Sequence, residues 1–357
     1  MNIQDFLKKA PYSLGKKDKS TFLNSFFFSL NKYHYKNSTN FKKIIDSIDF
    51  NINKKIPYEG LPFLPVRLFK NNTLKSISEK SITKTMTSSG TSGQEVSKIY
   101  LDKETSLNQT KAMIKIVSNF LGSKRAPMII IDSSSVLKNR NMFSARGAGI
   151  LGFSMFATKK IYALDDEMNI DFKTLVSFIN ENKDSKIFIF GFTYMIYQHF
   201  IKELKNSNTK LDLSNAILIH GGGWKKLQNE SISSDDFKLV LKEISGIEKV
   251  HDYYGMVEQT GSIYMECEYG HLHSSIFSDV IIRNPFDFSI LPIGEVGIIQ
   301  TLSILPKSYP GNSLLTEDEG VLLGEDDCKC GRMGKYFKVI GRIKNAEIRG
   351  CSDTYEK

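Results

Sequence analysis

The sequence predicts an α/β protein whose last third is a more antiparallel β region, and three features support this class. Short apolar runs at 127–132, 186–191 and 216–223 each end in turn residues, as buried strands do. The stretch 102–122 carries apolar residues at helical spacing, and helices alternating with strands favour an at least partly parallel sheet. After residue 250, short strand patterns are separated by glycine, proline and charged turns, which is typical of antiparallel pairing.

The individual elements follow from local signals. The first 80 residues contain helical patches rich in Phe and Tyr, such as STFLNSFFFSLNKYHYK, and we expect helices that cover a core. The helix over 102–122 has Asp102 as its expected N-cap and Gly122 as its stop. The later strands are expected within SIYMEC, HSSIFSDVIIR, GEVGIIQTLS and YFKVIGRI.

Composition limits the class of protein. The chain has 357 residues, of which 41% are apolar and 24% charged, as in ordinary soluble globular proteins. No stretch approaches the ~20 apolar residues that span a bilayer, and the N-terminus has no secretory-signal pattern. We therefore expect a cytoplasmic protein without stable membrane insertion. The net charge of +9 comes from scattered lysines, which argues against nucleic-acid binding but suits anionic partners such as nucleotides or an acidic carrier protein.

The stretch TSSGTSGQEVSK (87–98) concentrates glycine with small hydroxyl side chains. Glycine lets the backbone approach a ligand closely, and consecutive N–H groups can form an anion-binding concavity. No Gly-Lys-Ser/Thr follows, so this is not a Walker A loop. A plain surface loop is the alternative to a triphosphate-binding loop formed by Ser88, Ser89, Gly90, Thr91, Ser92 and Gly93.

Further polar residues stand where a nucleotide site needs them. In α/β sheets, ligands bind at the carboxyl ends of strands, and His220 with its following glycines occupies one such predicted end. Glu258 follows an aromatic-glycine turn, where a carboxylate can hold a metal ion near phosphates. Asp318 is expected in a polar turn that can accept hydrogen bonds from ribose hydroxyls. Arg342 follows a strand and a glycine, and its charge can reach ribose or phosphate.

Several motifs in this order resemble those of one superfamily: SSGTSG, HGGGWKKL, YYGMVEQTG, LLTEDEG, CKCGR and GRIKNAEIRGCSD. From about residue 55 onward the chain resembles adenylate-forming (acyl-AMP synthetase) enzymes of the phenylacetate–CoA ligase branch. Within that branch it resembles the LuxE-type acyl-protein synthetases, the long-chain-fatty-acid–luciferin-component ligases of bacterial bioluminescence. The resemblance implies the N-terminal domain of an adenylate-forming enzyme, with mixed α/β sheets and a smaller β region. It divides the chain into a helical N-terminal cap region (1–80), an adenylate-forming core domain (81–340) and a hinge-like remnant with a cysteine-bearing tail (341–357).

The resemblance also implies a task for each motif. Residues 88–93 would wrap the ATP phosphates, Glu258 would bind Mg²⁺, Asp318 the ribose, and Arg342 the ribose or phosphate edge. The adenine pocket would be lined by Gly221, Gly222, Gly223 and Trp224. Adenine or the acyl chain would pack against Tyr254 and Gly255. The implied reaction is attack of a fatty carboxylate on the α-phosphorus of ATP. It yields acyl-AMP and pyrophosphate and depends on positioning and charge neutralisation.

The tail departs from the superfamily pattern. Most relatives continue into a rotating C-terminal domain of about 100 residues that supplies a catalytic lysine, whereas only CSDTYEK follows Gly350. The hinge acidic residue usual after Gly-Arg is absent, with Lys344 and Asn345 in that region. We therefore expect the rotating domain to be missing or vestigial. The acyl-protein synthetases instead acylate their own cysteine near the C-terminus, which implies Cys351 as a nucleophile whose ionisation Arg349 favours. An incidental tail thiol is the alternative.

The other cysteines lie in CEYGHLH and CKCGR. In a cytosolic chain, metal binding or thiol chemistry is weighed before disulfides, and thiolates with imidazole are the usual ligands of structural zinc. The phenylacetate–CoA ligase branch shows a similar Cys…His and Cys-x-Cys-Gly-Arg arrangement. The expected zinc ligands are Cys267, His273, Cys328 and Cys330, with His271 as an alternate ligand. Buried thiols that bind no metal are the alternative to a zinc site.

The sequence therefore predicts an acyl-protein synthetase that uses ATP, Mg²⁺ and a fatty or other carboxylic acid, and that acylates its own Cys351. The partner would be an acyl-CoA reductase-type protein, an acyltransferase or an acyl carrier protein. A second hypothesis is an acyl-AMP ligase that hands the acyl group to CoA or a carrier-protein thiol. A third is a non-catalytic binding protein that kept the fold, against which Glu258, Asp318 and Arg342 argue.

Overall fold

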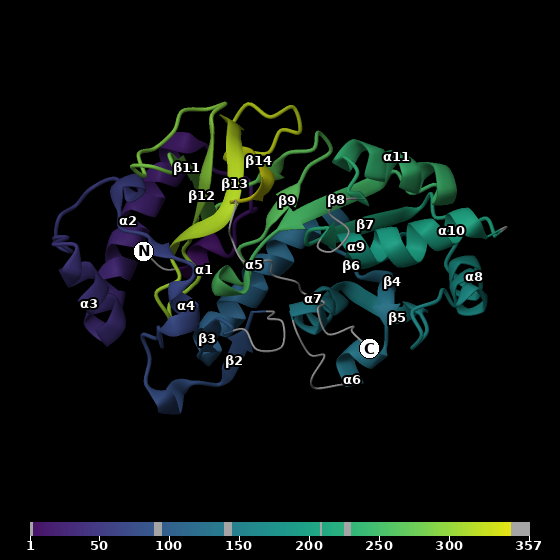
Figure 1. Cartoon of the computed structure of the whole chain (residues 1–357), viewed down its shortest axis with the longest axis horizontal. Helices are drawn as coiled ribbons and strands as arrows, with labels where there is room; N and C mark the ends of the chain where they lie inside the picture. Colours follow the sequence, from purple (N-terminus) through teal and green to yellow (C-terminus); the bar gives the residue numbers. More distant parts are fainter. Residues whose placement is uncertain (1–2, 89–94, 139–144, 208, 225–229, 344–357) are drawn as a thin grey trace. The chain divides into compact units, whose positions relative to one another are not determined.

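The computed structural model describes residues 3–88, 95–138, 145–207, 209–224 and 230–343 (Figure 1). The described chain forms two compact units. Unit 1 contains the described residues up to 88, those of 95–119 and those from 255 onward, and unit 2 contains the described residues of 120–254. The predicted limits of the core domain at 81 and 340 stay a prediction.

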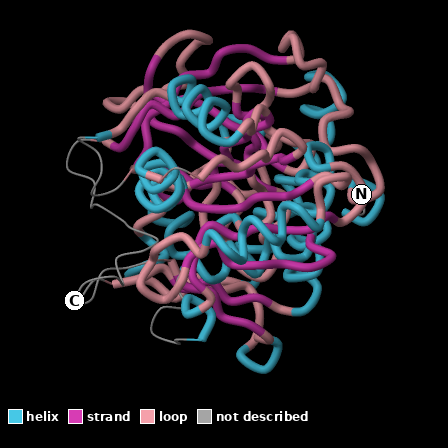
Figure 2. Tube along the Cα trace, turned by 90° about the vertical axis from the view of Figure 1, so that its right-hand side faces the viewer, coloured by secondary structure: helices cyan, strands magenta, loops and turns pink. Residues whose placement is uncertain are grey.

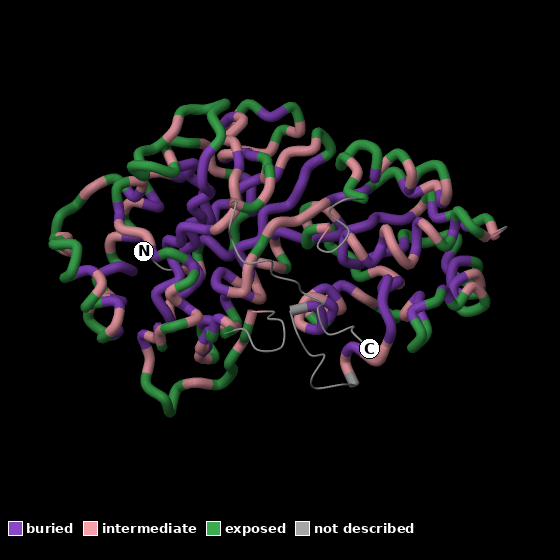
Figure 3. The backbone as a smooth tube through the Cα atoms, viewed as in Figure 1, coloured by how far each residue is buried: buried purple, intermediate pink, exposed green. Residues whose placement is uncertain are grey.

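Unit 2 is built on parallel strands. Their order is β5 (Ala157–Leu164), β4 (Ala126–Ser133), β6 (Ile187–Phe192), β7 (Ala216–Gly221) and β8 (Lys249–Tyr254), each paired in parallel with its neighbour. Strands β6 and β7 are buried along their whole lengths (Figure 3), which is why they appear as continuous apolar runs rather than as alternating patterns. The strands predicted at 127–132, 186–191 and 216–223 are confirmed.

Helices accompany these strands, as the cyan and magenta tubes of Figure 2 show. Two of them have side-chain caps: Asp171 accepts a hydrogen bond from the Thr174 amide, and Ser233 accepts one from the Asp236 amide. Gly246, with φ of 73°, ends the last helix in a left-handed conformation. The helices of unit 2 are α6 (Ser135–Lys138), α7 (Ala145–Phe153), α8 (Phe172–Glu181), α9 (Thr193–Met195), α10 (Lys202–Asn206) and α11 (Ser234–Ser245), with a π-helical turn at Ile196–Ile201.

Unit 1 contains the antiparallel β region predicted after residue 250. Its strand order is β11 (Ser278–Arg283), β12 (Val296–Ser303), β13 (Ser313–Glu325), β14 (Lys335–Arg342), β10 (Leu272–His273) and β9 (Tyr264–Glu266). The short β1 (Leu64–Pro65) runs parallel to β13, and β2 (Lys84–Thr87) pairs with β3 (Lys98–Leu101) in a separate antiparallel hairpin.

The prediction of a polar turn at Asp318 is wrong. Asp318 lies within β13, which pairs with β12 on one side and with β14 on the other. Asp318 pairs with Arg342 of β14, whereas residues 316–318 have no register partner on β12, where the pairing passes from Glu319 to Leu315. The Thr316 hydroxyl accepts a hydrogen bond from the Asp318 amide at 3.1 Å, so the polar stretch stays within the strand. The register shifts between Glu319 and Gly320, as in a β-bulge, and this irregularity is the remaining trace of the turn-like sequence.

The helices of unit 1 cover its core. Phe41 and Ile45 of α3 belong to a buried cluster with Leu64 of β1 and Ile99 of β3. The predicted N-cap of the helix at 102–122 is confirmed, because the Thr105 amide donates to Asp102 Oδ1 at 2.7 Å. None of the helices in the described part of the chain has the length and apolar character that a bilayer crossing requires. The remaining helices are α1 (Ile3–Phe6), α2 (Lys16–Asn37), α3 (Thr39–Ser47), α4 (Leu68–Asn71) and α5 (Lys103–Leu121).

Candidate functional site

Ser88 closes the base of the loop that joins β2 to β3 in unit 1. The Ser88 amide donates to the Ser97 carbonyl at 3.1 Å, and the Ser97 amide donates to Ser88 Oγ at 2.9 Å. The glycine-rich stretch therefore connects two antiparallel strands, unlike a Walker A loop, which leads from a strand into a helix. The other predicted phosphate-binding residues lie outside the described residues: Ser89, Gly90, Thr91, Ser92 and Gly93.

In unit 2, the backbone at Gly221 lies against the ring of Tyr253. The two residues are register partners on β7 and β8. A Cβ at Gly221 would stand 2.4 Å from Tyr253 Cε1, so the aromatic ring occupies the space that any side chain would need. Gly222 follows with φ of 79°, a left-handed conformation that favours glycine. The first two glycines of the predicted adenine segment are therefore required by the fold itself.

The rest of this segment is more open. Gly223 is exposed, and a Cβ built there would meet no atom within 4 Å. Trp224 is half-buried and contacts Tyr197 edge-on, with ring centroids 4.9 Å apart. Tyr254, at the end of β8, is also half-buried. The partly exposed rings of Trp224 and Tyr254 and the open space at Gly223 suit contact with a planar base, as the sequence predicts.

His220 lies at the carboxyl end of β7 in a hydrogen-bonded group that the sequence did not reveal. Its Nδ1 is 2.9 Å from Thr193 Oγ1 and 3.6 Å from Asp252 Oδ1. The Thr193 hydroxyl also donates to the Gly221 carbonyl at 3.3 Å, so its oxygen is left to accept a hydrogen bond from His220 Nδ1–H. Thr193 follows β6 and Asp252 lies in β8, the two strands adjacent to β7, and neither was assigned a role from the sequence.

Glu258 is buried in unit 1, with 2% of its surface exposed, in the helical turn Val257–Gln259. Gln259 stabilises this turn by donating to the Gly311 carbonyl at 2.8 Å. Burial, and to a smaller extent the Glu258 carboxylate, raise the pKa of Tyr309. Gly255 precedes the turn, and a Cβ there would stand 3.1 Å from Ile263 Cγ2. A buried carboxylate held in this way suits the cation ligand that the sequence predicts.

Asp318 and Arg342 are brought together by strand pairing. They are register partners on β13 and β14, and Arg342 Nε lies 3.5 Å from Asp318 Oδ1. Arg342 Nη2 also lies 3.3 Å from Glu317 Oε2. Both side chains are partly exposed, at 34% for Arg342 and 22% for Asp318. The pair thus offers a carboxylate for hydroxyl groups and a guanidinium for anionic oxygens at one place.

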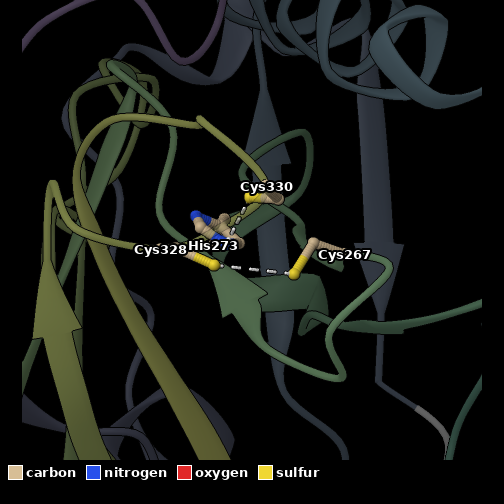
Figure 4. Close-up of side chains that lie close together, drawn as sticks. All are labelled: Cys267, His273, Cys328 and Cys330. Carbon is tan, nitrogen blue, oxygen red and sulfur yellow. Dashed lines mark hydrogen bonds between the residues drawn. The ribbon is translucent and has the colours of Figure 1, made fainter.

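The four residues predicted as zinc ligands converge in unit 1 (Figure 4). Cys267 follows β9, His273 ends β10, and Cys328 and Cys330 lie in the connection from β13 to β14. Their ligand atoms all lie within 4.8 Å of one another. The Cys267 and Cys328 sulfurs are 3.9 Å apart, and Cys330 Sγ is 3.3 Å from His273 Nε2. The alternate ligand His271 has its Nδ1 3.4 Å from Cys328 Sγ but lies outside this group of four.

These distances fit tetrahedral zinc. Zn–S bonds of about 2.3 Å and Zn–N bonds of about 2.0–2.1 Å imply tetrahedral edges of about 3.8 Å between sulfurs and about 3.6 Å between sulfur and nitrogen. Burial, and then Arg332, lower the pKa of His273 to about 4, which leaves a neutral imidazole with a lone pair at neutral pH. Burial raises the pKa of Cys328 to about 12, so a bound metal would displace the thiol proton. The donor set and its spacing therefore suit a structural metal.

Cys351, the predicted acyl acceptor, lies outside the described residues.

Comparison with solved structures identifies the fold. The crystal structure of 2-hydroxyisobutyryl-CoA ligase in the postadenylation state, in complex with R3-HIB-AMP, matches with a TM-score of 0.70, covering 94% of this chain and 70% of that one at 13% identity. ATP-bound MatB from Rhodopseudomonas palustris matches with a TM-score of 0.50, covering 75% of this chain and 49% of that one at 13% identity. The fold is that of adenylate-forming enzymes, and the chain is an AMP-forming ligase.

The family follows from the sequence as a whole. The family model described as "Acyl-protein synthetase, LuxE" matches residues 1–357, and the chain belongs to this family. The long-chain-fatty-acid–luciferin-component ligase of Vibrio harveyi is 23% identical over 329 residues, which cover 90% of this chain and 84% of that protein. The ligase of the same name from Aliivibrio fischeri is 24% identical over 307 residues, which cover 82% and 77%.

Proposed function

We propose that the protein activates a long-chain fatty acid, or another carboxylic acid of similar character, with ATP and then acylates its own Cys351. The observation that carries the proposal is the match of the acyl-protein synthetase family to the whole chain. The names of the two bacterial ligases support a fatty acid as the acid. A cytoplasmic location and Mg²⁺ as the cation of ATP belong to the same proposal.

In the first step, a carboxylate oxygen attacks the α-phosphorus of ATP, and the bond from that phosphorus to the bridging oxygen of pyrophosphate breaks. Residues 88–93 would surround the phosphates, and Glu258 would hold a cation that neutralises their charge. Asp318 accepts hydrogen bonds from the ribose hydroxyls, while Arg342 contacts the ribose or the phosphate edge. The adenine side is formed by Gly221, Gly222, Gly223, Trp224, Tyr254 and Gly255. The pairing of Asp318 with Arg342 supports this assignment, because it places an acceptor beside a cationic donor.

In the second step, the Cys351 thiolate attacks the acyl carbonyl carbon of acyl-AMP. A thioester bond forms, the bond between that carbon and the phosphate oxygen breaks, and AMP leaves. A protein-bound thioester can then be delivered to an acyl-CoA reductase-type protein, an acyltransferase or an acyl carrier protein.

One observation favours a second acceptor. The 2-hydroxyisobutyryl-CoA ligase shares the fold and has also been crystallised with 2-HIB-AMP and CoA in the thioesterification state. The alternative is therefore that the chain passes its acyl group to CoA or to a carrier-protein thiol.

We also propose that Cys267, His273, Cys328 and Cys330 hold a structural Zn²⁺. The support is the tetrahedral spacing of one nitrogen and three sulfurs, all within 4.8 Å of one another. A closed ligand set of this kind leaves no position for substrate, so the metal would stabilise the fold rather than take part in the reaction.

Acid-dependent exchange of labelled pyrophosphate into ATP tests the activation step. A panel of carboxylic acids should support exchange only when the acid fits, with long-chain fatty acids foremost and with no added thiol needed. Absence of exchange with every acid, under conditions in which the protein is folded, would favour a non-catalytic protein of the same fold. Product formation only after addition of CoA would favour the second acceptor.

A further inference from the structure

The connection from β13 to β14, residues 326–334, has a second role besides carrying Cys328 and Cys330. It is the surface on which the N-terminal segment 10–16 lies. The Met333 amide donates to the Tyr12 carbonyl at 3.3 Å, and the Lys16 amide donates to Asp326 Oδ2 at 2.7 Å. Lys16 Nζ also forms an ion pair with Glu325 Oε2 at 3.1 Å. Both ends of this connection therefore bind the same short piece of chain.

Tyr12 lies beside the proposed ligands themselves. Its side chain is buried, with 7% exposed, and its ring meets the His273 ring edge-on with centroids 6.1 Å apart. The guanidinium of Arg332 stands over the Tyr12 ring, 5.9 Å from its centroid. The Ile276 amide, three residues after His273, donates to the Pro11 carbonyl at 2.7 Å. The segment thus contacts the strand that carries His273 as well as the connection that carries two cysteines.

The ends of this connection are tied to each other, because the Asp326 amide donates to the Gly334 carbonyl at 3.2 Å and the Gly334 amide donates to Asp326 Oδ1 at 2.6 Å. Between these ends, Arg332 forms an ion pair with Glu268, and Cys328 and Cys330 are the thiols that a metal would hold. The connection has no helix or strand, and Asp326, Gly331 and Gly334 all adopt left-handed backbone conformations, with φ of 68°, 76° and 97°. Its sequence DDCKCGRMG offers few apolar side chains for a core. The two cysteines of the connection face Cys267 and His273 (Figure 4), and its Arg332 contacts Glu268 and the Tyr12 ring.

We propose that metal binding by Cys267, His273, Cys328 and Cys330 sets the shape of residues 326–334 and thereby docks the N-terminal segment 10–16, as a metal-dependent clamp. This inference rests on the zinc site proposed above. The clamp leads directly into α2, which begins at Lys16 and carries the buried Lys19, so loss of the metal loosens the start of that helix too.

Hydrogen exchange followed by mass spectrometry tests the clamp on the full chain. The purified protein should contain one equivalent of zinc, measured by elemental analysis. After removal of the metal by a chelator, peptides covering 10–17 and 326–335 should exchange at least tenfold faster, and readdition of Zn²⁺ should restore their protection. Peptides from β4, residues 126–133, serve as the control and should not change.

Three variants distinguish the effect of losing the metal from the effect of losing the contacts of the N-terminal segment. Cys328→Ser should lose the zinc and the protection of 10–17 together, whereas Cys351→Ser, the matched control for loss of a thiol, should keep both. Asp326→Ala removes the acceptor for the Lys16 amide and for the Gly334 amide, and it should loosen 10–17 while zinc stays bound. If the protein contains one equivalent of zinc and residues 10–17 remain protected from exchange after the zinc is removed, the clamp would be overturned. Absence of zinc from a protein that still forms acyl-AMP would overturn the metal site and leave the proposed activity standing.

Discussion

Asp318 and Arg342 face each other as register partners on β13 and β14, with Arg342 Nε 3.5 Å from Asp318 Oδ1. If this pair binds the ribose and phosphate edge, Asp318→Ala and Arg342→Ala should each lower kcat/KM for ATP by roughly 10- to 100-fold, because each removes a charge-assisted hydrogen bond. Since the two side chains contact each other, the double variant should lose less than the product of the two effects. Steady-state kinetics with varied ATP measures all three.

A neighbouring arginine provides the control for this prediction. Arg67 forms an ion pair with Glu317, the residue before Asp318 on β13, and is 54% exposed. Arg67→Ala should leave kcat/KM for ATP within about threefold of wild type, since exposed pairs contribute little. Equal losses for Arg67→Ala and Arg342→Ala would contradict a specific role of Arg342.

Gly221 and Gly223 should respond differently to the same added methyl group. Gly221→Ala places a Cβ 2.4 Å from Tyr253 Cε1, so the ring or the strand has to move, at a cost of about 1–3 kcal/mol in the free energy of unfolding. Gly223→Ala meets no atom within 4 Å and should change it by less than about 0.5 kcal/mol. Denaturant unfolding of both variants is the measurement, and equal stabilities would show that Tyr253 does not pack on Gly221.

A buried ionic group in unit 1 predicts a large effect on stability. Asp279 is 1% exposed, with Lys19 Nζ at 3.2 Å and Lys335 Nζ at 2.8 Å, and it also accepts a hydrogen bond from Tyr58. Asp279→Asn leaves both ammonium groups without their counter-charge and should cost about 3–5 kcal/mol in the free energy of unfolding. Asp46→Asn, which removes an exposed partner of Lys42, is the matched control and should have no measurable effect.

The same carboxylate predicts a pH dependence. Burial alone would raise the pKa of Asp279, but Lys19 and Lys335 outweigh it and hold that pKa below its ordinary value. A carboxyl whose pKa is lower in the folded state contributes stability above its unfolded pKa of about 3.9, and this contribution is lost as the pH falls further. The stability difference between wild type and Asp279→Asn should therefore be largest near neutral pH and shrink below about pH 4. A difference that grows on acidification would contradict the ion pairs.

Local signals were enough for much of the fold. The strands β4 and β7 carry mostly apolar residues because both of their faces are buried over most of their lengths, and such runs are visible without any partner. Asp102 could be predicted as a cap because its bond to Thr105 spans only three residues. Asp318 was misplaced because its strand is defined by pairing with β12 and β14, and that information is not local.

The candidate site shows the same division. The zinc ligands could be predicted from residue type, but His271 and His273 are two residues apart, and only the structure places His273 in the group of four. Thr193 and Asp252 carry no motif, and their contacts with His220 arise from the parallel register of three strands. Tyr253 was passed over for Tyr254 for the same reason: its contact with Gly221 crosses from β8 to β7.

The central proposal is acyl transfer to Cys351, and a labelling experiment tests it most directly. The protein is incubated with ATP, Mg²⁺ and radiolabelled long-chain fatty acid, denatured, and treated with neutral hydroxylamine, which cleaves thioesters. After denaturation, the wild-type protein should carry about one label per chain, and hydroxylamine should release it. The Cys351→Ser variant should form acyl-AMP at an unchanged rate but carry no label that hydroxylamine releases. Cys330→Ser tests whether another thiol accepts the acyl group and should remain labelled wherever the variant folds. Full hydroxylamine-sensitive labelling of Cys351→Ser would contradict the account.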